Sequence, residues 1–380
     1  MIWLAYFIFG FLVLRFMVSI SNLITRQWLR RANGAGDTFP EAASPPLVSV
    51  LIPARNEEKK IGSLLNDLFY QDYKNLEIIV YDDLSEDNTA RVVSDHIKKD
   101  SRIRLIEGRP LPYGWLGKSH GCHQLSLAAK GNYLLFLDAD VRVKSSLISS
   151  SLAHMHRYRL DLFSIFPKQE MHTFGEKITV PVMNWILVGL LPLILTRIST
   201  RPSLSAANGQ FMLFRAGVYH SSGFHKEVKE ILAEDIEIFR ISKKKGLRTH
   251  TVLSNVDITC RMYGSWSESL AGFSRNVPEF FGGHTWLAVL FALITTLGFI
   301  PVLFYLPRHL FLAFFVLIVI HRATISFLSR QPLVPNLLLA PLQQIAFCIM
   351  IITAINRRTR YALMWKGRNV YRSVLKPRMS

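Results

Sequence analysis

Cysteine is scarce in this 380-residue chain, which contains only Cys122, Cys260 and Cys348. Three thiols so far apart fit neither a disulfide framework nor the ligand spacing of a structural zinc site. His120 and His123 flank Cys122, but no second ligand pair follows at a suitable spacing, so we expect these side chains to pack along a helix. The sequence therefore favours reduced thiols in a cytosolic compartment.

Acidic residues are also few, with 27 Asp and Glu against 45 Lys and Arg and a formal net charge of +18. An excess of this size is one signature of nucleic acid binding. Many of the cations, however, lie beside apolar stretches, at Arg26, Arg30 and Arg31 and again between residues 357 and 378. Anionic lipid head groups explain that placement better, so we expect a membrane partner and no nucleic acid.

The apolar residues gather near the two ends of the chain. Residues 1–25 are long enough for one helical crossing of roughly 20 residues. Cations follow this stretch instead of preceding it, and no small-residue cleavage pattern occurs, so it is predicted to be an uncleaved anchor whose C-terminal side faces the cytoplasm. Residues 26–46 have the glycine and proline content of a linker.

A second apolar region covers residues 284–356, and a basic tail, residues 357–380, follows it. Three crossings in this region would place the tail outside the cytoplasm, against the positive-inside rule. We therefore expect an even number of crossings, and a multi-pass protein of the cell membrane with a cytoplasmic catalytic domain. The three candidate spans are 285–306, 310–328 and 333–355.

One of these three segments is expected to be re-entrant or to lie on the membrane surface. Pro335 and Pro341 interrupt the last one and make it the first candidate. His321 and Arg322 make the middle one a competing candidate, because ionisable residues are costly within a bilayer.

A further apolar stretch, residues 178–198, lies inside the middle of the chain, and Pro181 and Pro192 interrupt it. Candidate catalytic residues lie on both sides of it, so a single crossing would divide the active site. We predict helices in the membrane interface, near a lipid acceptor. The alternative is an ordinary pair of buried helices.

Short apolar runs alternate with amphipathic ones from residue 47 onward, which predicts an α/β catalytic domain over residues 47–283. Asn56 is a candidate cap for a helix that opens at Glu57, and another helix is expected from Asp87 to Ile97. Strands joined by helices imply a mostly parallel sheet that binds ligands at the carboxyl ends of its strands. The predicted strands are 47–52, 76–81, 103–106 and 133–137.

Acidic side chains follow two of the predicted strands. Asp138 and Asp140 alternate after residues 133–137 and supply the oxygen ligands that a hard divalent cation needs, although an Asp-x-Asp is often only a solvated turn. Asp82 and Asp83 end another strand, where a turn and helix cap is the alternative to ligand contact.

Two further positions have the chemistry of a site. Glu234 and Asp235 begin a predicted helix; Asp235 is a candidate N-cap whose carboxylate could also accept a hydroxyl proton. Lys118 ends the run Gly114-Trp-Leu-Gly-Lys at the start of another predicted helix, where it could meet a diphosphate; the alternative is a solvated lysine.

Four of these motifs, taken together and in this order, resemble the family 2 glycosyltransferases: residues 53–57, residues 82–89, Asp138-Ala-Asp140 and Glu234-Asp235. The resemblance covers approximately residues 47–283. It implies a GT-A fold, that is, a Rossmann-like and mostly parallel sheet, here with transmembrane helices at both ends. It also implies a nucleotide-sugar donor, a divalent cation (Mn²⁺ or Mg²⁺) and inversion at the anomeric carbon.

The same resemblance assigns roles to individual residues. Asp140 would hold the metal, Asp235 would be the general base, and Asp83 would contact the nucleobase. The other residues expected to bind the donor are Pro53, Ala54, Arg55, Glu57, Lys118 and Asp138. The residues expected to contact the acceptor or to gate the site are Asn208, Gly209, Gln210, Glu234, Arg261 and Trp266.

Within the family, residues 111–118, 208–210 and 260–263 look like those of the diaponeurosporenoate and hopene-associated glycosyltransferases. This narrower resemblance implies a terpenoid or carotenoid acid acceptor and suggests UDP-glucose as donor. Processive synthases carry Gln-x-x-Arg-Trp where this chain has Arg261-Met-Tyr-Gly-Ser-Trp266, so we expect a non-processive enzyme. The alternatives are a polyprenyl-phosphate sugar transferase and a non-catalytic membrane scaffold that binds nucleotide.

Overall fold

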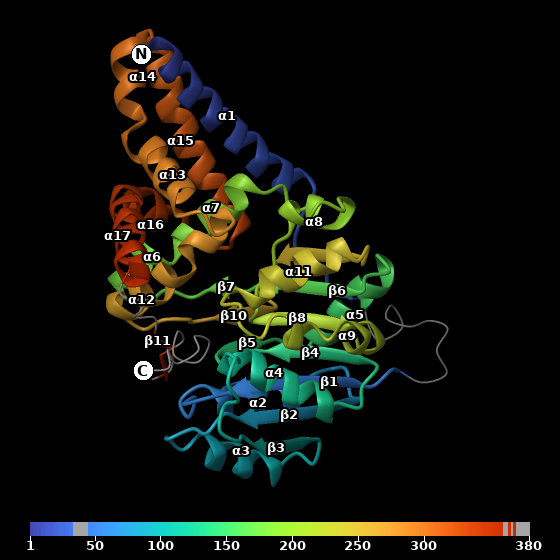
Figure 1. The fold of residues 1–380 in the computed structure, drawn as a ribbon. Coiled ribbons are helices and arrows are strands. Elements are labelled where there is room, and N and C mark those ends of the chain that lie inside the picture. Colours follow the sequence, from blue (N-terminus) through green and yellow to red (C-terminus); the bar gives the residue numbers. More distant parts are fainter. Residues whose placement is uncertain (33–44, 360–363, 366–367, 370–380) are drawn as a thin grey trace. The chain divides into compact units, whose positions relative to one another are not determined.

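The computed structural model describes residues 1–32, 45–359, 364–365 and 368–369 (Figure 1). They form two compact units. The helical unit comprises Met1–Gln27, Gln169–Leu195 and Arg261–Tyr361, and the sheet unit comprises Trp28–Lys168, Thr196–Cys260 and Ala362–Ser380. Most of the predicted linker and of the predicted basic tail lies outside the described residues.

The core of the sheet unit is a seven-stranded sheet of order β3-β2-β1-β4-β8-β6-β9. Neighbouring strands are parallel except at β8, which runs antiparallel to both β4 and β6. The predicted mostly parallel sheet is confirmed, and each of the four predicted strands agrees to within two residues at either end. The strands are β1 (Val48–Ala54), β2 (Leu76–Asp82), β3 (Ile103–Glu107), β4 (Tyr133–Leu137), β6 (Leu162–Phe166), β8 (Phe211–Arg215) and β9 (Thr249–Leu253).

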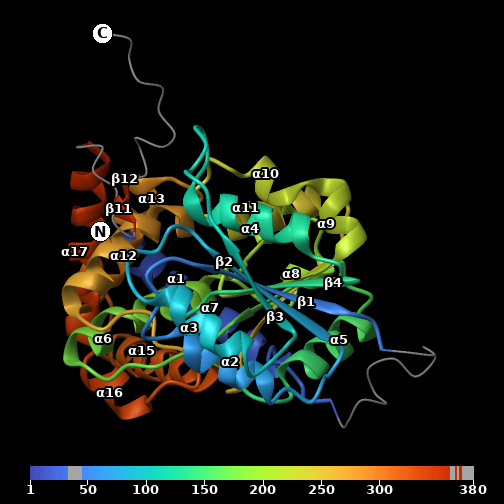
Figure 2. The same cartoon turned by 90° about the horizontal axis from the view of Figure 1, so that it is seen from below.

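Helices cover both faces of this sheet, as nearly continuous apolar strands require. Figure 2 shows α2 and α3 on one face and α4, α9 and α10 on the other. The helices of the unit are α2 (Ile61–Phe69), α3 (Thr89–Ile97), α4 (Gly117–Ala128), α5 (Leu147–Arg157), α9 (Ala216–Ser222), α10 (Phe224–Glu227) and α11 (Glu234–Lys244), with a 3-10 turn at Pro202–Leu204. The short elements are β5 (Val141–Val143), which pairs with β10 (Ile258–Cys260), β7 (Lys168–Gln169), α8 (Leu195–Ile198), and the hairpin of β11 (Met364–Trp365) and β12 (Arg368–Asn369).

The predicted helix start at Asn56 and Glu57 is wrong. Helix α2 begins at Ile61 after Lys60, and Asn56 has a left-handed backbone with φ of 53°. The reason is tertiary: the backbone N–H of Asn56 donates to Ser85 Oγ at 3.0 Å, so the segment after β1 pairs with the loop after β2 instead of coiling.

The helical unit contains three helices that are long and apolar enough to cross a membrane, Ile2–Ile24, Arg308–Leu328 and Ala340–Arg357. A fourth span is possible if the sharply bent pair Trp266–Phe281 and Thr285–Leu297 crosses as one. The helices are α1 (Ile2–Ile24), α6 (Phe174–Thr179), α7 (Pro181–Leu190), α12 (Trp266–Asn276), the 3-10 turn η3 (Val277–Phe281), α13 (Thr285–Leu297), α14 (Phe299–Tyr305), α15 (Arg308–Leu328), α16 (Leu333–Leu338) and α17 (Ala340–Thr359).

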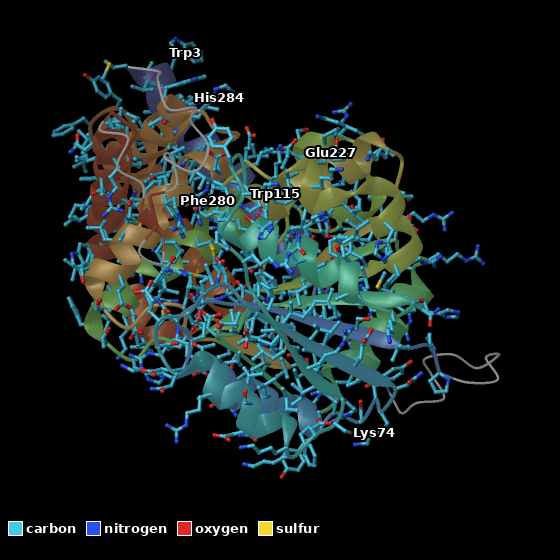
Figure 3. The ribbon with its side chains drawn as sticks, turned by 60° about the horizontal axis from the view of Figure 1, so that its bottom comes forward. Trp3, Lys74, Trp115, Glu227, Phe280 and His284 are labelled. Carbon is cyan, nitrogen blue, oxygen red and sulfur yellow. The ribbon has the colours of Figure 1, made fainter. Side chains whose placement is uncertain are left out.

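Large apolar side chains on these helices are exposed, as a lipid-facing surface requires. Trp3, which is 82% exposed, points away from the ribbon at the start of α1 (Figure 3). The predicted span 285–306 is interrupted at Gly298, where α13 ends and α14 begins. In the predicted insertion 178–198, most of α7 is buried, with α1, α15 and α17 beside it, which agrees with the alternative of buried helices.

Candidate active site

The loops that follow β1 and β2 are joined at the carboxyl edge of the sheet. The buried guanidinium of Arg55 donates from Nη1 to the backbone carbonyls of Asp83 at 2.6 Å and Leu84 at 2.7 Å. Its Nη2 donates to Glu86 Oε1 at 3.0 Å. Arg55, which we expected to line the nucleotide site, therefore also holds the loop that carries Asp83.

Backbone N–H groups after β1 complete this connection. Glu57 N donates to Thr89 Oγ1 at 2.8 Å, and Glu58 N donates to Asp87 Oδ2 at 3.1 Å. The β1 residues before them, Pro53 and Ala54, pair in parallel register with the end of β2. The predicted donor residues of both loops thus lie at one edge of the sheet.

The two aspartates after β4 each face a lysine. Lys118 Nζ lies 2.8 Å from Asp138 Oδ1, and Lys60 Nζ lies 3.6 Å from Asp140 Oδ2. Asp140 Oδ1 is buried and has no hydrogen-bond partner among the described residues. Burial, together with the neighbouring Asp138 carboxylate, raises the pKa of Asp140 to about 6. Lys60 is the one participant that the sequence did not indicate, because nothing in its local pattern separates it from a surface lysine.

Lys118 bridges two carboxylates that are far apart in the chain. Besides Asp138, its ammonium lies 3.3 Å from Glu234 Oε1. Burial by itself would lower the pKa of Lys118, but the carboxylates of Asp138 and Glu234 outweigh it and raise that pKa well above its usual value. The alternative of a solvated lysine is therefore wrong.

Asp235 is fixed by backbone donors on both sides of its carboxylate. Gly209 N donates to Oδ2 at 2.8 Å, and Ile236 N donates to Oδ1 at 2.8 Å. Helix α11 begins at Glu234 after Ala233, so the predicted N-cap role of Asp235 is wrong and the residue lies within the first turn. Burial, and next the Glu234 carboxylate, raise the pKa of Asp235 to about 7.

Gly209 lies where these charged groups meet. A Cβ atom at this position would be 2.8 Å from Lys118 Nζ, 3.4 Å from Glu234 Oε1 and 3.6 Å from Asp235 Oδ2. A Cβ here would displace the Lys118 ammonium, whereas its distances to the two carboxylates are ordinary contacts. We define the Lys118 cluster as Lys118, Asp138, Gly209, Glu234 and Asp235.

The side chains on either side of Gly209 are buried and hydrogen-bonded within the sheet unit. Asn208 Oδ1 accepts from Gln210 N at 2.9 Å, and Gln210 Nε2 donates to Cys260 Sγ at 2.8 Å. Their predicted contact with an acceptor stays a prediction.

Arg261 and Trp266, the other two residues predicted to gate the site, belong to the helical unit. Arg261 Nε donates to the buried Glu176 Oε1 at 2.8 Å, and the backbone of Trp266 lies against Gly175. Their predicted function stays a prediction as well.

Within the described part of the chain, no three His, Cys, Asp or Glu side chains are grouped as a metal site. The residues present nevertheless fit a divalent cation that takes most of its ligands from a bound phosphate. Asp140 offers an unpartnered buried carboxylate oxygen, and Asp138 offers a second hard oxygen ligand nearby.

Three comparisons relate this chain to known proteins. Residues 49–221 match the model of the family described as Glycosyl transferase family 2. A relative, the 4,4'-diaponeurosporenoate glycosyltransferase of Staphylococcus aureus (strain USA300), is 26% identical over 240 residues, which are 62% of this chain and 62% of that protein. The chain thus matches less than two thirds of that relative's length.

Among solved structures, a mannosyltransferase from Pyrobaculum calidifontis in complex with GDP-Man and Mn²⁺ superposes with a TM-score of 0.54. The match has 17% sequence identity and covers 93% of this chain and 96% of that one. At this identity the likeness concerns the fold, and it confirms the predicted GT-A fold.

Proposed function

Because this chain carries a family 2 glycosyl transferase domain, we propose that it is an inverting, non-processive glycosyltransferase that moves a hexose from a nucleotide-sugar donor to a lipid-like acceptor. The acceptor proposed is a terpenoid or carotenoid acid or a similar molecule, because the relative named above is a diaponeurosporenoate glycosyltransferase. UDP-glucose is the first donor to test.

The observation that carries the proposal is the Lys118 cluster. A carboxylate at about neutral pKa, a partly buried ammonium and a second carboxylate meet at Gly209, next to the loops of the parallel strands. Perturbed titratable groups at the carboxyl edge of such a sheet are typical of a catalytic site.

In the proposed donor complex, the joined loops after β1 and β2 bind the nucleoside. Asp83 contacts the base, while Pro53, Ala54, Arg55 and Glu57 line its site. Asp138 and Lys118 face the ribose and diphosphate, with the lysine as the positive partner of the phosphate oxygens. Asp140 would hold a divalent cation, which when bound offsets the charge on the departing diphosphate.

Asp235 is the proposed general base. Each oxygen of its carboxylate accepts one backbone N–H and keeps a lone pair for a substrate proton. It would remove the proton of an acceptor hydroxyl as the acceptor oxygen bonds to the anomeric carbon. The bond from that carbon to the diphosphate oxygen breaks, and its electron pair leaves with the nucleoside diphosphate. A carboxylate acceptor would attack without losing a proton, and Asp235, whose pKa is about 7, would then position it in its protonated form through a hydrogen bond.

Apolar helices of spanning length support a membrane location. We propose a multi-pass protein of the cell membrane whose sheet unit is cytoplasmic, because Arg26, Arg30 and Arg31 follow the first apolar helix.

The direct test is to incubate membranes containing the full chain with a panel of nucleotide sugars, with and without Mn²⁺ or Mg²⁺. Mass spectrometry of the extracted lipids would reveal a hexose increment on an acceptor and would identify that acceptor, including a polyprenyl phosphate. A scaffold that only binds nucleotide predicts no product under any of these conditions.

Two variants separate the roles. Asp235→Asn is expected to bind donor normally and to lower the transfer rate at least a hundredfold, whereas Asp140→Asn is expected to lose the metal dependence of donor binding. Glu237→Gln is the matched control, because this residue forms a partly exposed ion pair with Arg240 on the same helix. A transfer rate of Asp235→Asn equal to that of the natural chain would show that Asp235 is not the general base.

A further inference from the structure

Two arginines among the apolar helices of the helical unit have no acidic partner within the described part of the chain. Arg15, near the middle of α1, is only 3% exposed, and Arg322 lies on α15 and is partly exposed. No Asp or Glu occurs in α1, α7 or any helix from α13 to α17. A charged group in an apolar environment is costly unless a counter-charge accompanies it.

Both guanidinium groups lie against the same indole ring. The guanidinium carbon of Arg15 is 4.5 Å, and that of Arg322 is 5.0 Å, from the ring centroid of Trp185. The electron-rich faces of aromatic rings attract cations, and Phe291 adds a second ring at 4.9 Å from Arg15. Ring contacts leave the formal charge unchanged, however, so the two like charges still repel each other.

Neutral amides orient Arg322. Its Nη1 donates to Gln343 Oε1 at 3.0 Å, and its Nη2 approaches Gln344 Oε1 at 3.4 Å. The amide nitrogens of both glutamines are engaged elsewhere, with the Lys177 carbonyl and Thr295 Oγ1 respectively, so the carbonyls are fixed toward the guanidinium. These contacts set the plane of the guanidinium without neutralising it.

Arg15 and its neighbour His321 each have an unpaired nitrogen among the described residues. Arg15 Nη2 donates to the Trp185 carbonyl at 3.3 Å, but Arg15 Nε and His321 Nε2 are buried and have no hydrogen-bond partner among the described residues. Gly189 lies against both residues: a Cβ there would be 3.0 Å from Arg15 Nη2 and 3.3 Å from His321 Nε2. Buried polar nitrogens of this kind usually have a partner, protein or not.

We propose that Arg15 and Arg322, on Trp185, form a binding site for the phosphate group of a membrane lipid. Planar guanidinium groups bind phosphate oxygens in pairs, and a phosphate would supply the missing negative charge. The partial exposure of Arg322 gives a head group access. Val319, one turn earlier on α15 and 48% exposed, offers an apolar surface for the attached chain. This site goes beyond the proposed glycosyl transfer and needs neither donor nor metal.

The test measures lipid binding by the full chain, purified in a neutral detergent. The probes are dodecyl phosphate, its choline ester and inorganic phosphate, with binding followed by native mass spectrometry. We expect dodecyl phosphate to bind, and Arg322→Gln to weaken that binding at least tenfold. Arg308→Gln, an exposed cation on the same helix, is the control and should bind as the natural chain does.

Arg322→Lys is a second variant that tests whether a loss of binding comes from misfolding. It keeps the positive charge but cannot form the paired hydrogen bonds of a guanidinium, so it should bind dodecyl phosphate with intermediate strength. Unchanged binding by Arg322→Gln would overturn the site. If inorganic phosphate bound as tightly as dodecyl phosphate, the ligand would not be a lipid. If the choline ester bound as tightly as dodecyl phosphate, the site would not recognise the net negative charge of the head group. Because no sugar donor is present, these outcomes are independent of whether glycosyl transfer is found.

Discussion

At the scale of single residues, the absence of a side chain at Gly209 leaves room for the Lys118 ammonium. Gly209 leaves free the space beside the Lys118 ammonium that a Cβ would occupy, while Asp235 accepts the N–H of the same glycine. The glycine thus connects the proposed base to the positive charge beside the proposed diphosphate site.

Gly209→Ala is predicted to lower kcat at least tenfold, because its Cβ would lie 2.8 Å from Lys118 Nζ and the ammonium would have to move. A tenfold loss corresponds to about 1.4 kcal/mol of barrier. Gly217→Ala on α9 is the control, since its Cβ would meet nothing within 4 Å. Steady-state kinetics with the natural lipid extract would check this, and equal rates for both variants would contradict it.

At the scale of elements, α6 shows how one side chain can connect two segments. Thr173 and Glu176 form a capping box at its start, and the same Glu176 carboxylate accepts from Arg261. The ion pair therefore attaches the segment after β10 to the first turn of α6. This connection is internal to the helical unit.

Thr173→Ala is predicted to destabilise the protein by about 1 kcal/mol, because the backbone N–H of Glu176 loses its side-chain acceptor. Thr173→Ser retains the hydroxyl and should remain close to the natural protein. Thermal unfolding of the two variants in detergent measures the difference. Identical midpoints would show that the capping box contributes nothing there.

At the scale of the whole molecule, acid is predicted to destabilise the sheet unit through its buried histidines. Burial lowers the pKa values of His154 and His225 to about 3 each. The unfolded chain binds a proton at each below about pH 6.5, whereas the folded chain does not until near pH 3. Their contribution to stability is therefore complete above pH 6.5 and is lost as the pH falls from 6.5 toward 3, by up to about 1.4 kcal/mol per pH unit for each.

Denaturant unfolding at pH 7.5 and pH 5.5 would measure this effect. His225→Phe should reduce the loss between the two pH values, whereas His172→Gln, at an exposed position, should leave it unchanged. An equal loss in all three proteins would assign the acid sensitivity to other groups.

The proposed membrane topology makes a second prediction at this scale. In intact cells, a cysteine introduced at Trp3 should react with a membrane-impermeant thiol reagent, because the start of α1 would face outward. A cysteine at Lys74, which is exposed at the surface of the sheet unit, should react only after lysis. The reverse pattern would place the sheet unit outside the cell.

Local sequence determined many of the secondary-structure elements of this protein and the chemistry at the ends of its strands. The four predicted strands, the apolar helices and the acidic groups at strand ends follow from patterns a few residues long, because hydrophobic periodicity and chain chemistry act over that range. Only the tertiary structure determined where one predicted helix begins and which charged side chains pair. Asn56 does not begin the predicted helix, because its backbone N–H donates to Ser85. Lys118 pairs with Glu234, which lies 116 positions further along the chain. Whether a charged side chain is solvated or buried beside an opposite charge depends on which distant segments the fold brings together, and no local pattern contains that information.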